Sequence, residues 1–237
     1  MRRTMVLVAV VAAWGVSAGP AGALEQRNGV SPVSAEYGNQ SNGKRVWVIG
    51  DSITDDRQYG GTMFGKIGMT FVGAGRSVHI DGSSGLTIID HAAWGTIQRA
   101  ASSNARAVIV ELGTNDIGFV STMDQYNAAV AYLNWAASTL KNSGKCVVWI
   151  GLNGNGNRQV FLTGKPWYDN PIYATMFNQQ IQARVGGGFL YGDYTYLVNS
   201  NATFRNGLGD TIHPTSDAAK NELVKWYSSL LAFGCGV

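Results

Sequence analysis

Several kinds of residue are scarce in this sequence, and each shortage argues against a class of protein. Its 237 residues include two cysteines and three histidines, and Asp, Glu, Lys and Arg together make up 14%. Two cysteines cannot build a zinc site by themselves. Without Arg2 and Arg3, which lie in the N-terminal segment 1–23, 16 of the 18 Lys and Arg residues remain against 15 Asp and Glu residues. So small a net charge gives no reason to expect nucleic acid or an anionic membrane as a partner.

Long apolar runs are also lacking after residue 23. Within residues 1–23, the apolar run at 5–16 is well short of the roughly 20 residues that a membrane-spanning helix needs. It follows Arg2 and Arg3, and a small-residue Ala-Gly-Ala sequence ends at Ala23, as a signal-peptidase site requires. We therefore expect a signal peptide over 1–23 and a secreted, extracellular protein without a stable membrane anchor.

The chain after residue 23 predicts one folded domain behind a flexible leader. Residues 24–44 have few large apolar side chains and many Gly, Asn and Ser residues, which is typical of a mobile segment. The remaining stretch, 45–237, is long enough to form a single domain with a sizeable hydrophobic core.

Strand-like and helix-like segments alternate along 45–237. Apolar, β-rich runs lie at 45–49, 77–80, 107–112, 146–152 and 189–191. Helical spacing of apolar residues marks segments at 89–100, 126–140, 172–185 and 216–233. Nearly continuous apolar strands are typical of parallel sheets that helices cover on both faces. We therefore expect an α/β fold, a three-layer αβα sandwich with a central, mostly parallel, flavodoxin-like sheet.

Polar turns follow the first three strands, and a fourth polar segment precedes the last helix. Residues 50–52, 82–85 and 113–116 follow the strands, and residues 210–214 lead into the helix. The carboxyl ends of parallel strands share one edge of the sheet, where ligands bind in such folds. A helix antiparallel to the strands begins at that edge as well. The four segments should therefore meet in one cleft.

These four segments carry the groups of a serine nucleophile. A serine hydroxyl becomes reactive when a neutral imidazole takes its proton and a carboxylate orients that imidazole. Ser52, His213 and Asp210 can play these three parts. The backbone N–H groups of Ser52 and Gly85 and the side-chain amide of Asn115 can form an oxyanion hole for the developing negative charge.

The same segments resemble a known family. The sequences GDSIT at 50–54, GSSG at 82–85, ELGTND at 111–116 and DTIHP at 210–214 are similar to the ordered blocks of the SGNH hydrolases, also called the GDSL esterase/lipase family. The resemblance implies that Ser52 is the nucleophile and that Asp210 and His213 complete a catalytic triad. It also implies that Gly85 and Asn115 complete the oxyanion hole.

Three other residues of these blocks have supporting parts or depart from the family pattern. The resemblance implies that Asp51 and Asp116 support their turns and are not catalysts. Thr211 stands where many members of the family have Gly after the Asp, which leaves the geometry of that turn open. No metal and no organic cofactor is implied.

Each site residue also has an ordinary structural explanation. Ser52 could cap a helix, Asn115 could shape a turn, and His213 could be a capping or packing residue. We prefer the catalytic interpretation because a single cleft explains why they occur together. The other histidines are poorer bases, since His79 lies in a strand and His91 is expected to face solvent.

The sequence favours a secreted serine ester hydrolase that works through an acyl-serine intermediate. Residues 151–170 include several Asn, Trp167 and Tyr168, which could bind a sugar or could pack against their own domain. We expect short acyl groups on carbohydrate or small alcohols as substrates. Two alternatives remain open: an acyltransferase that uses the same acyl-serine, and a non-catalytic secreted carbohydrate-binding domain.

The two cysteines can meet at the edge of the sheet opposite the cleft. Cys146 opens its strand and Cys235 follows the last helix, whose end should also lie away from the cleft. In an exported protein they can form one disulfide, and two separate buried thiols are the alternative. We prefer the bridge on this topology.

Overall fold

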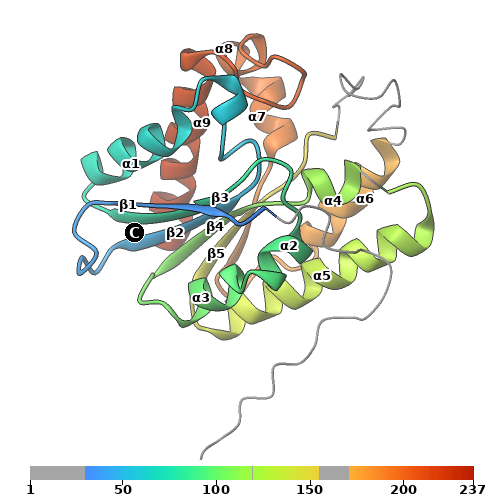
Figure 1. Ribbon diagram of the computed structural model, residues 1–237, viewed down its shortest axis with the longest axis horizontal. Coiled ribbons are helices and arrows are strands. Elements are labelled where there is room, and N and C mark those ends of the chain that lie inside the picture. The colour runs from blue at the N-terminus through green and yellow to red at the C-terminus, as the bar shows by residue number, and fades with distance from the viewer. Residues whose placement is uncertain (1–29, 119, 155–170) are drawn as a thin grey trace, which may run out of the picture.

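The structure is a computed structural model, and it describes residues 30–118, 120–154 and 171–237 (Figure 1). The strands in these ranges are β1 (Val33–Tyr37), β2 (Arg45–Gly50), β3 (Ser77–Gly82), β4 (Ala107–Glu111), β5 (Cys146–Ile150) and β6 (Phe189–Gly192). They form one sheet in the order β1-β3-β2-β4-β5-β6. β1 is antiparallel to β3, and all other neighbouring pairs are parallel.

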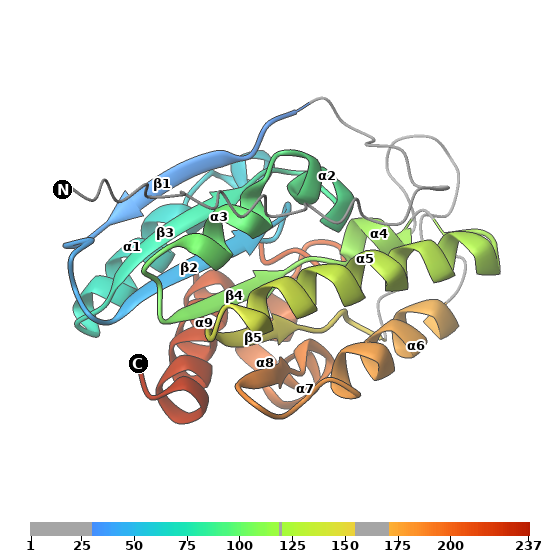
Figure 2. The same cartoon turned by 90° about the horizontal axis from the view of Figure 1, so that it is seen from below.

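Helices cover both faces of this sheet, as Figures 1 and 2 show. One face carries α1 (Met63–Gly73), α7 (Tyr194–Ser200), α8 (Ala202–Asn206) and α9 (Asp217–Leu230). The other carries α2 (Ile88–Ala93), α3 (Thr96–Ser102), α4 (Thr114–Gly118), α5 (Met123–Asn142) and α6 (Pro171–Gln182). The predicted three-layer αβα sandwich is therefore confirmed. Leaving out β1, the parallel strands follow the 2-1-3-4-5 order of flavodoxin-like folds.

The strands are apolar because both faces of the sheet are covered. Every residue of β4 is buried, and so is every residue of β2 after Arg45. Phe71 of α1, Tyr227 of α9 and Leu133 of α5 are fully buried in the helical layers. Burial of such apolar surface stabilises a fold by about 25 cal/mol per Å². The turns that carry the site start from the ends of these buried strands, so the central layer holds them in place.

The sequence missed β1. A flexible leader was predicted over residues 24–44, and for residues 33–37 that prediction was wrong, because they pair along their whole length with β3. β1 is an edge strand with mostly exposed or half-exposed side chains, so it lacks the apolar signal of the central strands. The Tyr37 ring takes the space that a side chain at Gly68 would need. Residues 1–29, which include the predicted signal peptide, lie outside the described residues.

The helices differ from the predicted segments mainly at their ends. The segment 89–100 is two helices, α2 and α3, separated at Gly95, whose φ is 68°. α5 begins after Thr122, whose side chain accepts a hydrogen bond from the backbone N–H of Gln125. No helix in the described ranges combines the length and the hydropathy needed to span a membrane.

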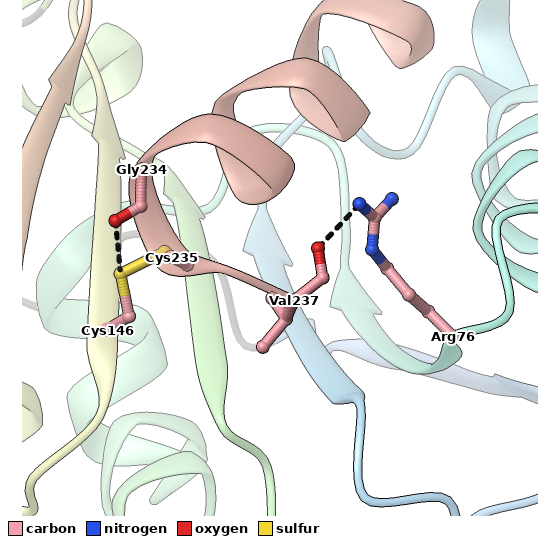
Figure 3. The surroundings of a disulfide bond; sticks show 5 residues. All are labelled: Arg76, Cys146, Gly234, Cys235 and Val237. Carbon is pink, nitrogen blue, oxygen red and sulfur yellow. Dashed lines mark hydrogen bonds between the residues drawn. A yellow bond between two sulfur atoms is a disulfide. The ribbon is translucent and has the colours of Figure 1, made fainter.

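A disulfide joins Cys146 and Cys235, with a Cα–Cα distance of 5.6 Å. Figure 3 shows Cys146 at the start of β5 and Cys235 in η2 (Leu231–Cys235), the turn that follows α9. The side chain of Arg76 donates a hydrogen bond to the Val237 carbonyl at 2.6 Å. The predicted bridge is thus present, and together these contacts fix the end of α9 at one edge of the sheet.

Candidate active site

The turns after β2, β3 and β4 lie side by side. Gly50, the last residue of β2, pairs with Gly82 at the end of β3 and with Glu111 at the end of β4. A Cβ atom on Gly50 would lie 2.0 Å from Oγ1 of Thr54, so this position has no room for a side chain. Ser52 therefore lies in a turn that has the turns after β3 and β4 on either side of it.

Ser52, His213 and Asp210 form a continuous chain of hydrogen bonds. Oγ of Ser52 lies 2.7 Å from Nε2 of His213, and Nδ1 of His213 lies 2.7 Å from Oδ2 of Asp210. The side chains of Ser52 and His213 are almost wholly buried. Because Asp210 accepts the proton on Nδ1, Nε2 can accept the proton of the serine hydroxyl.

The loop before α9 holds Asp210 and His213 in this arrangement. Oδ1 of Asp210 accepts hydrogen bonds from the backbone N–H of Ile212 at 3.2 Å and of His213 at 2.8 Å. Its other oxygen, Oδ2, therefore faces the imidazole. The Asn153 amide donates to the Thr211 carbonyl at 2.7 Å. Thr211 has a φ of 67°, and no other non-glycine residue in the described ranges has a positive φ.

Asn115 and Gly85 lie in the turns that flank the serine. The side chain of Asn115 is buried at the start of α4, and its Nδ2 donates to Oδ2 of Asp51 and to the Leu86 carbonyl, both at 3.0 Å. Both amide hydrogens are therefore engaged within the protein. Gly85 has a φ of 82°, a left-handed conformation that favours glycine. Asn115 thus binds the residue that precedes Ser52.

Buried carboxyl groups lie beneath these turns. Burial and the neighbouring charge of Asp51 raise the pKa of Glu111 well above its ordinary value. Oε2 of Glu111 accepts a hydrogen bond from the Thr54 hydroxyl at 3.2 Å. Burial also raises the pKa of Asp116 to about 7, although its carboxylate accepts hydrogen bonds from the backbone N–H of Ile88. These acids brace the site turns from within the core.

Tyr59 contacts the site although no motif marked it. Its hydroxyl oxygen lies 3.3 Å from Nδ1 of His213 and 3.4 Å from Oδ2 of Asp210. Its ring centroid lies 4.8 Å from that of His213. The only signal in the sequence is that Tyr59 follows Ser52 by a few residues in a glycine-rich stretch.

His91 was predicted to face solvent, and that prediction was wrong. Its side chain is fully buried, with Nε2 3.1 Å from the Gly50 carbonyl. Burial lowers the pKa of His91 to about 4, so the ring is neutral at physiological pH. His91 does not belong to the apolar pattern of its segment. It is buried because its polar side chain contacts the end of β2.

Two further features concern ligands. In the described part of the chain, no group of three or more His, Cys, Asp and Glu side chains is arranged to hold a metal ion. Most of the segment that was considered for sugar binding, including Trp167 and Tyr168, lies outside the described residues.

Comparison with solved structures finds the same fold in ester-cleaving proteins. A GDSL-like lipase from Bacteroides thetaiotaomicron is 16% identical, with a TM-score of 0.60, over 81% of this chain and 90% of that protein. An acetylxylan esterase from Geobacillus stearothermophilus is 19% identical, with a TM-score of 0.55, over 83% of this chain and 95% of that protein. At such low identity these similarities establish the fold.

The family is established by the sequence itself. A comparison with curated proteins finds no significant match. The model of the GDSL-like Lipase/Acylhydrolase family matches residues 48–220, which is more than half of the chain and includes all of the predicted site residues. The chain therefore belongs to the GDSL-like lipase/acylhydrolase family.

Proposed function

We propose that this protein is a secreted serine ester hydrolase in which Ser52, His213 and Asp210 form the catalytic triad. The observation that carries the proposal is the pair of 2.7 Å hydrogen bonds that links the serine hydroxyl to the imidazole and the imidazole to the carboxylate. The nucleophile, its base and the group that orients the base are thus within hydrogen-bonding reach of one another. Membership of an acylhydrolase family supports the same chemistry.

The reaction proceeds in two steps. Ser52 attacks the ester carbonyl while its proton passes to Nε2 of His213, and the alcohol then leaves with that proton. A water molecule next gives a proton to His213 and attacks the acyl-serine, which releases the carboxylic acid and returns the proton to Ser52. Asp210 stabilises the positive charge that His213 carries in both steps. The imidazole of His213 must therefore be neutral before each attack.

Three donors are proposed for the oxyanion hole: the backbone N–H groups of Ser52 and Gly85 and the side-chain amide of Asn115. In the structure Nδ2 of Asn115 donates to Asp51 and to the Leu86 carbonyl. Asn115 would therefore exchange one of these acceptors for the substrate oxygen as negative charge develops. Loss of one oxyanion donor typically lowers the rate by about 10²–10³.

The proposed substrates are short acyl groups on carbohydrate or small alcohols. A solved structure with this fold is an acetylxylan esterase, which supports the choice of an acetylated carbohydrate. Export is proposed from the N-terminal sequence, and the Cys146–Cys235 disulfide is compatible with an oxidising compartment.

An ester panel tests this function. The purified protein is assayed on p-nitrophenyl esters from acetate to palmitate and on acetylated xylan, with Ser52→Ala as the matched control. We expect turnover of acetate esters that exceeds turnover of long-chain esters, and loss of both in Ser52→Ala. Turnover that Ser52→Ala retains would disprove the serine mechanism. A competing alcohol that captures most of the acyl group would identify an acyltransferase instead.

A further inference from the structure

Tyr59 covers one side of the Asp210–His213 pair. It is the last residue of η1 (Arg57–Tyr59), a short turn between Ser52 and α1. Its hydroxyl reaches both partners of the Asp210–His213 hydrogen bond, at 3.4 Å and 3.3 Å. Its ring is tilted by 33° against the imidazole at a centroid distance of 4.8 Å. One side chain therefore contacts both the base and the group that orients it.

A buried lysine holds the backbone of Tyr59 in place. The side chain of Lys220, on α9, is 2% exposed, and Nζ donates a hydrogen bond to the Tyr59 carbonyl at 2.6 Å. Nζ also forms an ion pair with Oδ2 of Asp56 at 2.5 Å. The other oxygen of Asp56 accepts a hydrogen bond from the backbone N–H of Met63 at 2.9 Å. These contacts tie the loop before α1 to the helix that follows His213. Removal of either charged group would leave the other buried without a partner, which is strongly destabilising.

We infer that Tyr59 is a positioning residue for acyl transfer, which acts through His213 and Asp210 and which the Lys220–Asp56 ion pair holds over the imidazole. This inference rests on the proposed function. The phenol hydroxyl donates to Oδ2 of Asp210 and so keeps the carboxylate directed at Nδ1 of His213. The centroid of the phenol ring, 4.8 Å from that of the imidazole, lies within the distance at which an aromatic ring attracts a cation. It therefore stabilises the imidazolium that forms when His213 takes the serine proton.

The two parts of the side chain can be separated by mutation. Tyr59→Phe removes the hydroxyl and keeps the ring, and Tyr59→Leu removes both. We expect kcat to fall by about 2- to 10-fold in Tyr59→Phe, the effect of one lost hydrogen bond, with KM unchanged. Tyr59→Leu should lower kcat by up to about 10²-fold, since the imidazole is then less well placed. Tyr196→Phe is the matched control, because Tyr196 is 66% exposed on α7.

Two readouts distinguish positioning from a merely structural role. In Tyr59→Phe the acid limb of the kcat/KM–pH profile should move to higher pH, because the carboxylate of Asp210 no longer shares its charge with the phenol. The proton between Nδ1 of His213 and Asp210 should also change its low-field ¹H NMR resonance. The protein has three histidines, which makes this resonance assignable. Tyr196→Phe should leave both readouts unchanged.

The outcome separates this inference from the proposed function. If the wild type hydrolyses esters and Tyr59→Phe matches it in kcat, pH profile and NMR resonance, the inference is overturned and the ester hydrolase proposal stands. If the wild type hydrolyses no ester, the NMR resonance still tests whether Tyr59 acts on the Asp210–His213 pair. A Tyr59→Phe variant with a wild-type melting temperature and a shifted resonance supports the inference.

Discussion

Oγ of Ser52 lies 2.7 Å from Nε2 of His213, although 161 residues separate them in the sequence. Ser52 is carried by the end of β2, and His213 lies in the loop that enters α9. Their contact therefore depends on how α9 is placed on the sheet. The disulfide at Cys235 fixes the far end of that helix, and the Lys220–Asp56 ion pair fixes its first turn.

Replacement of Thr211 should stabilise the protein. A β-branched residue at φ 67° is strained, and glycine adopts this conformation freely. We expect Thr211→Gly to raise the free energy of unfolding by about 1 kcal/mol, after the greater flexibility of glycine in the unfolded chain is subtracted. Urea denaturation measures the change. Thr211→Ala is the control and should gain much less, whereas a less stable Thr211→Gly would show that the threonine side chain contributes contacts that outweigh its strain.

Glu111 should make the protein less stable as pH rises. Its folded-state pKa lies well above 4.5, chiefly because it is buried. The folded state therefore binds more protons than the unfolded state from pH 4.5 upwards, and stability falls with rising pH through that window. Glu111→Gln keeps a neutral hydrogen-bonding side chain and should remove this dependence, so that the variant gains on the wild type as pH rises.

Urea denaturation at a series of pH values from 5 to 9 measures this effect. Glu222→Gln is the surface control. A hydrogen bond with Lys225 lowers the pKa of Glu222, so this variant should show no gain in stability over the wild type as pH rises. Parallel pH curves for the wild type and Glu111→Gln would contradict the raised pKa of Glu111.

His79 should stabilise the attachment of β1 at low pH. Although burial opposes its charged form, hydrogen bonds and the charges of Asp81 and Glu36 raise the pKa of His79 above 6.5. Its ring also lies on Trp47, with centroids 3.9 Å apart. The stabilisation is fully present below pH 6.5 and is lost as pH rises through the folded-state pKa.

The variant His79→Gln therefore should lose more stability at pH 6 than at pH 9. Thermal unfolding at the two pH values measures the difference, and NMR titration of the His79 ring gives its pKa directly. An equal loss at both pH values would mean that the positive charge of His79 contributes nothing.

The disulfide should contribute to stability and not to turnover. It bridges residues 89 apart in the sequence, and the loop-entropy model gives about 4–5 kcal/mol for a loop of that length. We expect the Cys146→Ser/Cys235→Ser variant to lose stability of that order in urea while it keeps most of its ester turnover at 25 °C. A reductant should destabilise the wild type and leave the variant unchanged. Equal denaturation curves with and without reductant would contradict a bridged wild type.

The strands and the meeting of the four motifs could be predicted because they follow from general rules. The runs that became β2, β4 and β5 are almost wholly apolar, as buried parallel strands must be. Parallel strands then place the turns that follow them on one edge, whatever the loops do. For this reason Ser52 and Asn115 could be assigned to a common edge without coordinates.

What could not be predicted depends on contacts that leave no local pattern. All five residues of β1 are exposed or half-exposed, so its pairing with β3 leaves no apolar pattern in the sequence. Tyr59 reaches His213 because a turn and a distant loop happen to meet, and no spacing encodes that. His91 is polar and falls outside the apolar pattern of its segment, although its ring nitrogen lies within hydrogen-bonding distance of the Gly50 carbonyl.

If His213 activates Ser52 as a nucleophile, a fluorophosphonate should label Ser52 covalently and should need His213 to do so. The protein is treated with the reagent, and peptide mass spectrometry locates and times the adduct in the wild type, Ser52→Ala and His213→Ala. We expect a single adduct on Ser52 that forms at least about 10³-fold more slowly in His213→Ala and is absent from Ser52→Ala. An adduct on another residue, or one that forms on Ser52 at the wild-type rate without His213, would contradict it.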